Sequence, residues 1–196
     1  MRFPGLAVGF APWALYLVMP HRLGEGALLF AGLVTAAVAC ALTRWTRGRS
    51  GIKLLGAAAV VTFTSIAAAS LLVSDGVTRW FGAYSSGIVL FVLAAVMFRS
   101  LVGVPFTEQY SREGLPNEYW EAPRLHALNV RISLVWALCT LAAAVSVTIG
   151  SVVAEHNSSS LMQFLALSLS WLMPVLLMLI ACRYMAIATG VSNLTL

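Results

Sequence analysis

Long apolar runs separated by short polar stretches form the main pattern along this chain. Five runs each approach the roughly 20 residues that a helix needs to cross the hydrocarbon core of a bilayer. None of them contains Asp, Glu, Lys, Arg or His. The runs cover residues 27–43, 54–73, 80–98, 132–153 and 161–182. The pattern therefore predicts five transmembrane helices.

A sixth apolar run occupies residues 3–20 and contains Pro4, Pro12 and Pro20. Because proline inside a helix removes a backbone hydrogen bond and bends the helix, this run could cross the membrane or lie tilted in one leaflet. We expect it to cross. The chain is then one domain, residues 1–196, an all-α integral membrane protein. We expect a bundle of five to six transmembrane helices with a cytoplasmic amphipathic loop.

Charge is scarce and unevenly distributed. Only 10% of the 196 residues are charged and 60% are hydrophobic, whereas soluble domains have roughly 25% charged residues. With six crossings, ten of the twelve Lys and Arg residues share the side of both termini, and Arg22 and Arg79 lie opposite. Basic residues gather on the cytoplasmic side of membrane proteins, so both termini are predicted to be cytoplasmic.

A basic turn follows the 27–43 run, and its side chains are candidates for contact with anionic lipid headgroups. It contains Arg44, Trp45, Arg47, Arg49 and Lys53. Each Lys or Arg beside an anionic membrane surface gains on the order of 1 kcal/mol, and Trp is enriched at headgroup level. The chain has a net charge of +5. We therefore expect it to bind anionic membrane lipids, and we expect no binding of nucleic acid.

Small residues at helical spacing predict where the helices approach each other, because small side chains let backbones pack closely in a bilayer. Three such stripes should face the bundle interior. The first stripe could equally contact a second copy of the chain. The stripes are Gly5 and Gly9; Ala58, Thr62, Ser65 and Ala69; and Thr140, Ala144 and Thr148.

The 161–182 run carries polar groups that could line a cavity. Gln163 and Ser170 lie about two turns apart on one helix face, and Pro174 follows on that face. Proline should bend the helix, and a nearby serine hydroxyl could satisfy the carbonyl that loses its partner.

Groups that could hold a cofactor or a metal are scattered. His21, His126 and His156 fall in three different loops, whereas haem and zinc sites need clustered ligands. The three cysteines lie in apolar runs without CxxC spacing, which is typical of small core residues. We expect no cofactor and no metal site.

Catalytic residues are not expected either. Glu155 and His156 precede Ser158, Ser159 and Ser160, but neighbouring residues in one turn rarely reach the geometry of a nucleophile and its base. The five clear crossings also lack the ionisable groups that ion-coupled transporters carry. We predict that the chain is not an enzyme.

The segment 105–129 departs from the apolar pattern, since it holds four of the seven acidic residues. Thr107 and Glu108 suit a helix start, and Pro123 suits the first turn of the next helix. We expect a segment on the cytoplasmic membrane surface. Exposed aromatic and basic residues are typical contact anchors, so the candidate partner-binding residues are Tyr119, Trp120, Arg124 and His126.

Several local features, taken in order, resemble the bacterial intracellular septation protein A family of small inner-membrane proteins. The features span most of residues 10–185. They are Phe10, Pro12 and Tyr16; Trp45, Arg47, Arg49 and Lys53; Asp75, Arg79 and Trp80; Pro105, Leu115, Pro116 and Trp120; and Leu128, Asn129, Trp136 and Ala137. The chain differs from the family in the longer spacings from Trp120 to Asn129 and from Asn129 to Trp136.

The resemblance implies a non-enzymatic protein of the bacterial inner membrane that acts in cell-envelope maintenance or septation. It would be a scaffold or adaptor for a membrane protein partner, or for a second copy of itself, through the 105–129 loop. An alternative is a small-molecule carrier or binding component that uses the helix interior around Gln163, Ser170 and Pro174. A third is a membrane enzyme in which Glu118, Glu121, His126 or Arg131 converge.

Overall fold

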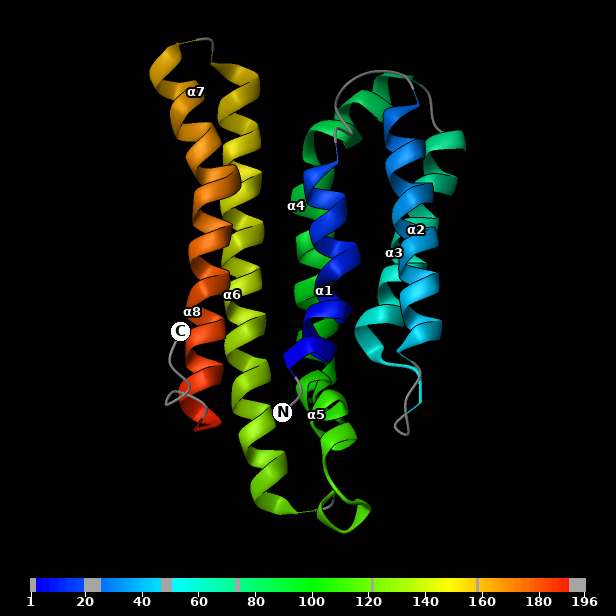
Figure 1. The fold of residues 1–196 in the computed structure, drawn as a ribbon. Helices are drawn as coiled ribbons and strands as arrows, with labels where there is room; N and C mark the ends of the chain where they lie inside the picture. Colours follow the sequence, from blue (N-terminus) through cyan, green and yellow to red (C-terminus); the bar gives the residue numbers. More distant parts are fainter. Residues whose placement is uncertain are drawn as a thin grey trace.

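The computed structural model describes residues 3–19, 26–46, 51–72, 75–120, 122–157 and 159–190, and these are almost entirely helical (Figure 1). The long helices are α1 (Phe3–Val18), α2 (Ala27–Trp45), α3 (Leu54–Leu72), α4 (Asp75–Ser100), α6 (Pro123–His156) and α8 (Met173–Ala188). Shorter elements are α5 (Phe106–Ser111), two 3₁₀ turns at Arg112–Gly114 and Asn117–Tyr119, α7 (Ser160–Leu167) and a π-helical turn η3 (Ser168–Leu172).

The five predicted crossings are confirmed as helices that are long and apolar enough to span a membrane. They are Ala27–Trp45, Leu54–Leu72, Trp80–Ser100, Pro123–His156 and Ser160–Ala188. The sixth, α1, has 16 residues and measures about 24 Å at 1.5 Å per residue, less than the ~30 Å of a hydrocarbon core. That α1 crosses completely stays a prediction.

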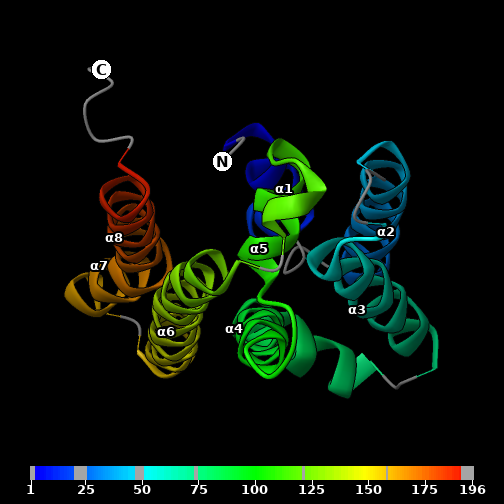
Figure 2. The ribbon, with the colours of Figure 1, turned by 90° about the horizontal axis from the view of Figure 1, so that it is seen from below.

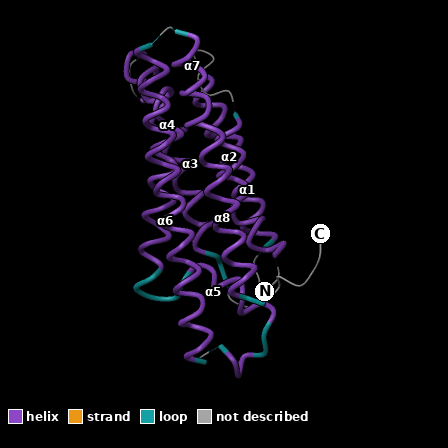
Figure 3. The backbone as a smooth tube through the Cα atoms, turned by 90° about the vertical axis from the view of Figure 1, so that its left-hand side faces the viewer, coloured by secondary structure: helices purple, strands orange, loops and turns teal. Residues whose placement is uncertain are grey.

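The helices form a curved row. Seen from below, α8, α6, α4, α3 and α2 follow one another, and α1 and α5 lie on the inner side of the curve (Figure 2). Each helix of the row contacts the next, and α1 contacts α2, α3 and α4. The tube view shows the long helices running side by side, with α5 near one end (Figure 3). The hydrophobic core therefore lies between α1 and the middle of the row.

Close backbone approach explains two of the helix pairs. A Cβ on Gly32 of α2 would lie 3.0 Å from the backbone nitrogen of Ala67 in α3. In α4, a side chain on Gly87 would overlap Thr148 of α6. The stripe through Thr140, Ala144 and Thr148 thus faces the bundle interior, as predicted.

The stripe predicted on α3 is wrong, because Ser65 and Ala69 are exposed. The buried face contains Leu55, Ala59, Phe63, Ile66 and Ala67 instead. Phe63 fixes this face, since its ring packs against Trp13 and Tyr16 of α1 at centroid distances of 5.3 and 5.1 Å. Aromatic packing, not the smallest residues alone, therefore sets the rotation of α3.

Two predicted loops also proved shorter. Residues 75–79, expected in a turn, begin α4, and residues 154–156 end α6. The helix-start signal at Pro123 is confirmed, because α6 begins at this residue and continues without a break into the fifth crossing. At 34 residues, α6 measures about 51 Å and extends past the other helices near α5 (Figure 1).

Candidate functional site

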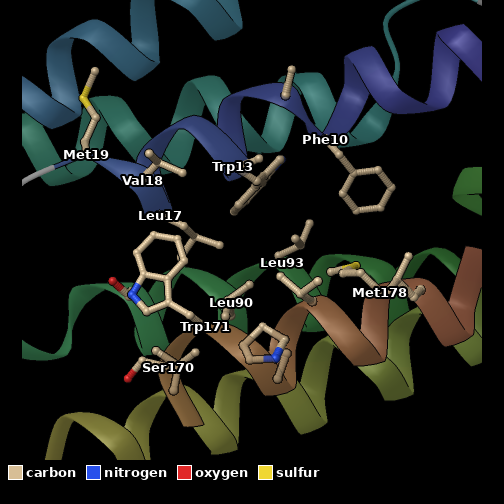
Figure 4. Close-up of a pocket in the computed structure, with 18 of the residues that line it drawn as sticks. Phe10, Trp13, Leu17, Val18, Met19, Leu90, Leu93, Ser170, Trp171 and Met178 are labelled. Atoms are coloured by element: carbon tan, nitrogen blue, oxygen red, sulfur yellow. The ribbon is translucent and has the colours of Figure 1, made fainter. Parts of the chain in front are cut away.

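A cavity of about 960 Å³ opens between α1 and the C-terminal helices. We call it the α1–α8 groove. One wall is α1 from Leu6 to Met19, the other is α7 to α8 from Gln163 to Met185, and α4 and α6 form the floor. Figure 4 shows side chains from both walls pointing into this space. All three residues predicted from sequence to line a cavity, Gln163, Ser170 and Pro174, belong to its lining.

The bend predicted at Pro174 takes the form of the π-helical turn η3. The backbone N–H of Met173 donates to the carbonyl of Ser168, five residues earlier. In that register the carbonyl of Leu169 would need a donor from Pro174, which has none. Ser146 of α6 supplies it, because its hydroxyl donates to Leu169 O at 2.7 Å. The freed carbonyl is thus satisfied from a neighbouring helix and not by Ser170.

Close packing fixes the same turn against α6. A Cβ on Gly150 would lie 2.5 Å from the Ser170 hydroxyl oxygen, 2.9 Å from the carbonyl oxygen of Ala166 and 3.2 Å from the side chain of Leu169, so the Ser170 hydroxyl lies beside α6. Together, Gly150 and Ser146 hold η3 tightly on α6, and the opposite face of α7 to α8 stays open. In the span Ser160–Ala188 only 11% of an apolar 18-residue stretch is buried, whereas 50% of such a stretch is buried in α6.

The groove lining is mostly apolar, and its polar groups are uncharged. Several lie at one end, while the buried indole nitrogen of Trp136, which has no partner among the described residues, lies beside Phe10. Within the described ranges, no Asp, Glu, Lys, Arg or His lines it. The Gln163 amide donates to the carbonyls of Ala154 and Asn157, at 3.3 and 2.7 Å. The Ser170 hydroxyl makes no hydrogen bond to another described residue, and Trp171 is 47% exposed. This end of the groove can therefore offer hydrogen bonds without charge.

The charged loop is folded inward more than the sequence indicated. In α5, Phe106, Thr107, Glu108, Tyr110 and Ser111 are all buried. The short helix lies beneath α1 and beside α4 and α6 (Figure 2). The segment predicted to lie on the membrane surface is thus partly a packed element of the bundle end.

Glu108 is the centre of the most buried charge cluster among the described residues. Its carboxylate is 1% exposed, accepts from Arg112 Nη2 at 2.6 Å and Nε at 3.1 Å, and lies 2.8 Å from His126 Nδ1. A buried carboxylate needs such partners, since an unpaired charge away from water is costly. His126 is therefore engaged inside the chain, although half of its side chain stays exposed.

Uncharged hydrogen bonds join α5 to α6 next to this cluster. The Thr107 hydroxyl donates to Asn129 O at 3.1 Å and lies 2.8 Å from the Ser133 hydroxyl. Ser111 donates to Asn129 Oδ1 at 3.0 Å. Since these groups are buried, the bonds satisfy atoms that water cannot reach.

Lys53 occupies a different place from the headgroup position expected of it. The side chain is 4% exposed, donates to Glu113 at 3.0 Å and lies 4.6 Å from the centre of the Tyr110 ring. Next to it, Leu54 N donates to Gln109 Oε1 at 2.8 Å. Lys53 thus links the start of α3 to α5.

Tyr110 packs in this cluster with its hydroxyl unpaired among the described residues. Burial raises the pKa of the Tyr110 phenol, and the Glu113 carboxylate raises it further. A Cβ on Gly9 would overlap the Tyr110 hydroxyl and lie 2.9 Å from Cζ, whereas one on Gly5 would lie 3.6 Å away. The glycine pair of α1 therefore makes room for a side chain of the same chain.

The other headgroup candidates lie at the surface or outside the described ranges. Arg44 is exposed and Trp45 is 78% exposed, as a headgroup contact requires. Residues 47–50, with Arg47 and Arg49, lie outside the described residues.

The candidate partner-binding residues divide into two groups. Tyr119 is 56% exposed and Arg124 is exposed. Trp120 is half-buried, its indole donates to the carbonyls of Arg112 and Leu115 at 3.0 and 3.2 Å, and the Arg112 guanidinium lies 5.6 Å from its ring. Trp120 and His126 thus stabilise the loop, whereas the side chains of Tyr119 and Arg124 are exposed and make no hydrogen bond or ion pair with another described residue.

The residues weighed for catalysis have local roles. Glu155 accepts from the Tyr84 hydroxyl, and His156 Nδ1 lies 3.0 Å from the Val152 carbonyl. Ser159 caps α7 by accepting from Met162 N. Among the residues considered for a membrane enzyme, His126 pairs with Glu108, and Glu121 lies outside the described residues. In the described ranges, no three His, Cys, Asp or Glu side chains could share a metal ion.

Sequence reasoning missed Glu108 and Lys53 as buried charges. The spacing of Glu108 and Arg112, four residues apart, could have indicated their pair. The other pairs could not be predicted from neighbouring residues in the sequence. Lys53 lies 60 residues from Glu113, and Glu108 lies 18 residues from His126.

Comparison of the chain with protein-family models, curated proteins and solved structures gives no match. The fold and the site therefore carry the functional conclusion by themselves.

Proposed function

We propose that this chain is a multi-pass membrane protein that binds a lipid-like molecule in the α1–α8 groove, as a binding component or carrier. The observation that supports it is the apolar cavity of about 960 Å³ between the shorter apolar helix α1 and three helices that could span a membrane. Its volume lies near the top of the roughly 300–1,000 Å³ range of ligand pockets, which are mostly apolar with a few placed polar groups.

The geometry favours a ligand taken from the bilayer. Both walls of the groove belong to apolar helices, so a hydrocarbon chain can enter sideways without passing through water. The Ser170 hydroxyl, which makes no hydrogen bond to another described residue, gives such a ligand one polar contact. A water-soluble charged substrate has no matching charge in the described lining, and burying its charge would be costly.

Mass spectrometry of lipids that co-purify with the protein in mild detergent tests this proposal. Ala14 is exposed and lines the groove, so Ala14→Phe should fill it and reduce the retained lipid at least fivefold. Ala68 of α3 is also exposed but lies outside the lining, so Ala68→Phe is the matched control and should retain wild-type amounts. Equal retention in all three proteins would overturn the proposal.

A second candidate is an adaptor that captures a protein through the 105–129 loop. The exposed side chains of Tyr119 and Arg124, next to the protruding start of α6, favour it. Exposed Tyr and Arg are frequent anchors of interfaces. The resemblance to the septation protein A family would make the partner a division or wall-synthesis protein.

Capture with a Tyr119→Ala, Arg124→Glu variant tests the adaptor function without disturbing Trp120 or the Glu108 cluster. A stoichiometric partner lost only in this variant would support it. A partner retained by the variant, or absent from the wild type, would contradict it.

We further propose that the chain lies in a bacterial inner membrane with both termini cytoplasmic. The supporting observation is the ten-to-two distribution of Lys and Arg over the predicted sides, which topology follows. Reporter fusions at Arg2 and after Leu196 should both report a cytoplasmic location, and a periplasmic signal from the C-terminal fusion would overturn the orientation.

A further inference from the structure

The α1–α8 groove has two chemically different ends. Figure 4 shows Ser170 and Trp171 near Leu17, Val18 and Met19 at one end, and Phe10 and Met178 toward the other. We propose that the groove selects an uncharged lipid with a hydroxyl-bearing head, such as a monoacylglycerol, and holds the head at the Ser170 end. This inference rests on the proposed function and specifies its ligand.

The absence of charge in the described lining argues for a neutral head. A phosphate or carboxylate placed there would lose water without gaining a cation, and an unpaired buried charge is far more costly than a hydroxyl that finds a hydrogen bond. The buried ion pairs of this chain lie instead around α5, and α5 contributes no residue to the groove lining.

The polar groups at the Ser170 end match what a hydroxyl needs. The Gln163 amide nitrogen is used by Ala154 and Asn157, whereas its carbonyl oxygen has no donor in the described ranges and can accept. Ser170 can donate and accept, and the Trp171 indole can only donate. A hydroxyl both donates and accepts, so Ser170 can satisfy one hydroxyl of the head. The Gln163 carbonyl, about two turns away along the helix, can accept from another.

The opposite end is mostly hydrocarbon, although the buried Trp136 indole nitrogen there has no partner among the described residues. Phe10 stacks on Trp136 at 4.8 Å between ring centroids, and the flexible side chains of Met178 and Met185 lie along the wall, where methionine adapts to irregular shapes. From Leu6 to Met19 the wall extends about 20 Å at 1.5 Å per residue, longer than the ~15 Å of one hydrocarbon leaflet. A long chain can therefore lie along the groove.

Equilibrium binding of two probes with the same chain tests the selection. We compare monooleoylglycerol with its phosphate ester, lysophosphatidic acid, on the full-length protein in detergent. The neutral probe should bind at least tenfold more tightly. Ser170→Ala and Trp171→Phe should each weaken it about three- to tenfold, as the loss of one hydrogen bond does, and leave binding of the headless probe hexadecane unchanged.

The outcomes separate the two proposals. Equal or tighter binding of lysophosphatidic acid, or unchanged affinity in both variants, would overturn the proposal of a neutral head. The groove itself would still be supported if the wild type binds hexadecane and Ala14→Phe does not. If no probe binds the wild type more tightly than Ala14→Phe, both proposals fail.

Discussion

The two faces of α1 have different neighbours. One face packs on α2 and α3, where Trp13 and Tyr16 contact Phe63, and its glycines receive Tyr110 of α5. The other face borders the α1–α8 groove. The packed side is closed by buried ion pairs and hydrogen bonds around α5, whereas the groove lining has no charge in the described ranges.

This difference shows where function should be sought. A polar loop in an apolar chain attracts attention as a recognition site, yet Glu108, Lys53 and Trp120 are occupied by partners within the chain. The groove has little polarity in its sequence, but it holds open space and the Ser170 hydroxyl, which has no partner among the described residues. Charge stabilises the end of the bundle around α5, and the open groove lies along the other face of α1.

The largest effect should follow loss of the Glu108 carboxylate. Glu108→Ala leaves Arg112 and His126 without their buried partner, so the free energy of unfolding in micelles should fall by about 2–4 kcal/mol, less than for a fully buried triad because both partners are partly exposed. Glu118→Ala removes an exposed acid of the same loop and should change the free energy of unfolding by less than about 0.5 kcal/mol. If Glu108→Ala lowers the free energy of unfolding as little as Glu118→Ala does, the structural role of Glu108 would be contradicted.

A side chain at Gly9 should be nearly as harmful. Gly9→Ala forces its Cβ into the Tyr110 ring and should cost about 1–3 kcal/mol, as overpacking does. Gly5→Ala places its Cβ at an ordinary 3.6 Å from Tyr110 and should be tolerated. Thermal unfolding of both variants measures the comparison, and a Tyr110→Leu background should relieve Gly9→Ala only.

The η3 turn gives a smaller, paired prediction on the groove side. Ser146→Ala removes the donor to Leu169 O and should cost about 1 kcal/mol. Pro174→Ala restores a backbone N–H near that carbonyl, so Ser146→Ala should cost less in this background. A double-mutant cycle measures the difference, and independent effects of the two changes would contradict the assignment.

The smallest effect concerns alkaline pH. Because the pKa of Tyr110 is raised above the ordinary 10.0 in the folded chain, the unfolded chain releases this proton first. Stability should therefore fall as the pH rises above about 10. Tyr110→Phe removes this contribution and loses no hydrogen bond, so its stability should fall less steeply with pH. Parallel slopes for the two proteins between pH 9 and 11 would contradict the burial of the phenol.

Sequence periodicity predicted what depends on length and apolarity. The five spanning helices follow from runs without charge, and the start of α6 follows from Pro123. An irregularity of the helix at Pro174 was also predicted, since proline removes a donor wherever it lies in a helix, and the structure has the π-helical turn η3 just before it. These features depend on residues close together in the chain.

Features that depend on distant residues were not predictable in the same way. The stripe on α3 was misplaced because Phe63, through its contacts with α1, decides which face is buried. Lys53 was predicted to contact lipid headgroups, because its partner Glu113 is distant in the sequence and only the fold brings the two together. Gln163, Ser170 and Pro174 could be named as cavity residues, but the other wall, α1, comes from the opposite end of the chain.

Alkylation of Cys182 is the most direct test of an occupied groove, because this exposed cysteine belongs to the lining and Cys40 of α2 does not. Peptide mass spectrometry would compare the labelling rates of both cysteines before and after bound lipid is extracted. If the groove holds lipid, labelling of Cys182 should accelerate several-fold on extraction while that of Cys40 stays constant. Labelling of Cys182 at the same rate in both states would contradict an occupied groove.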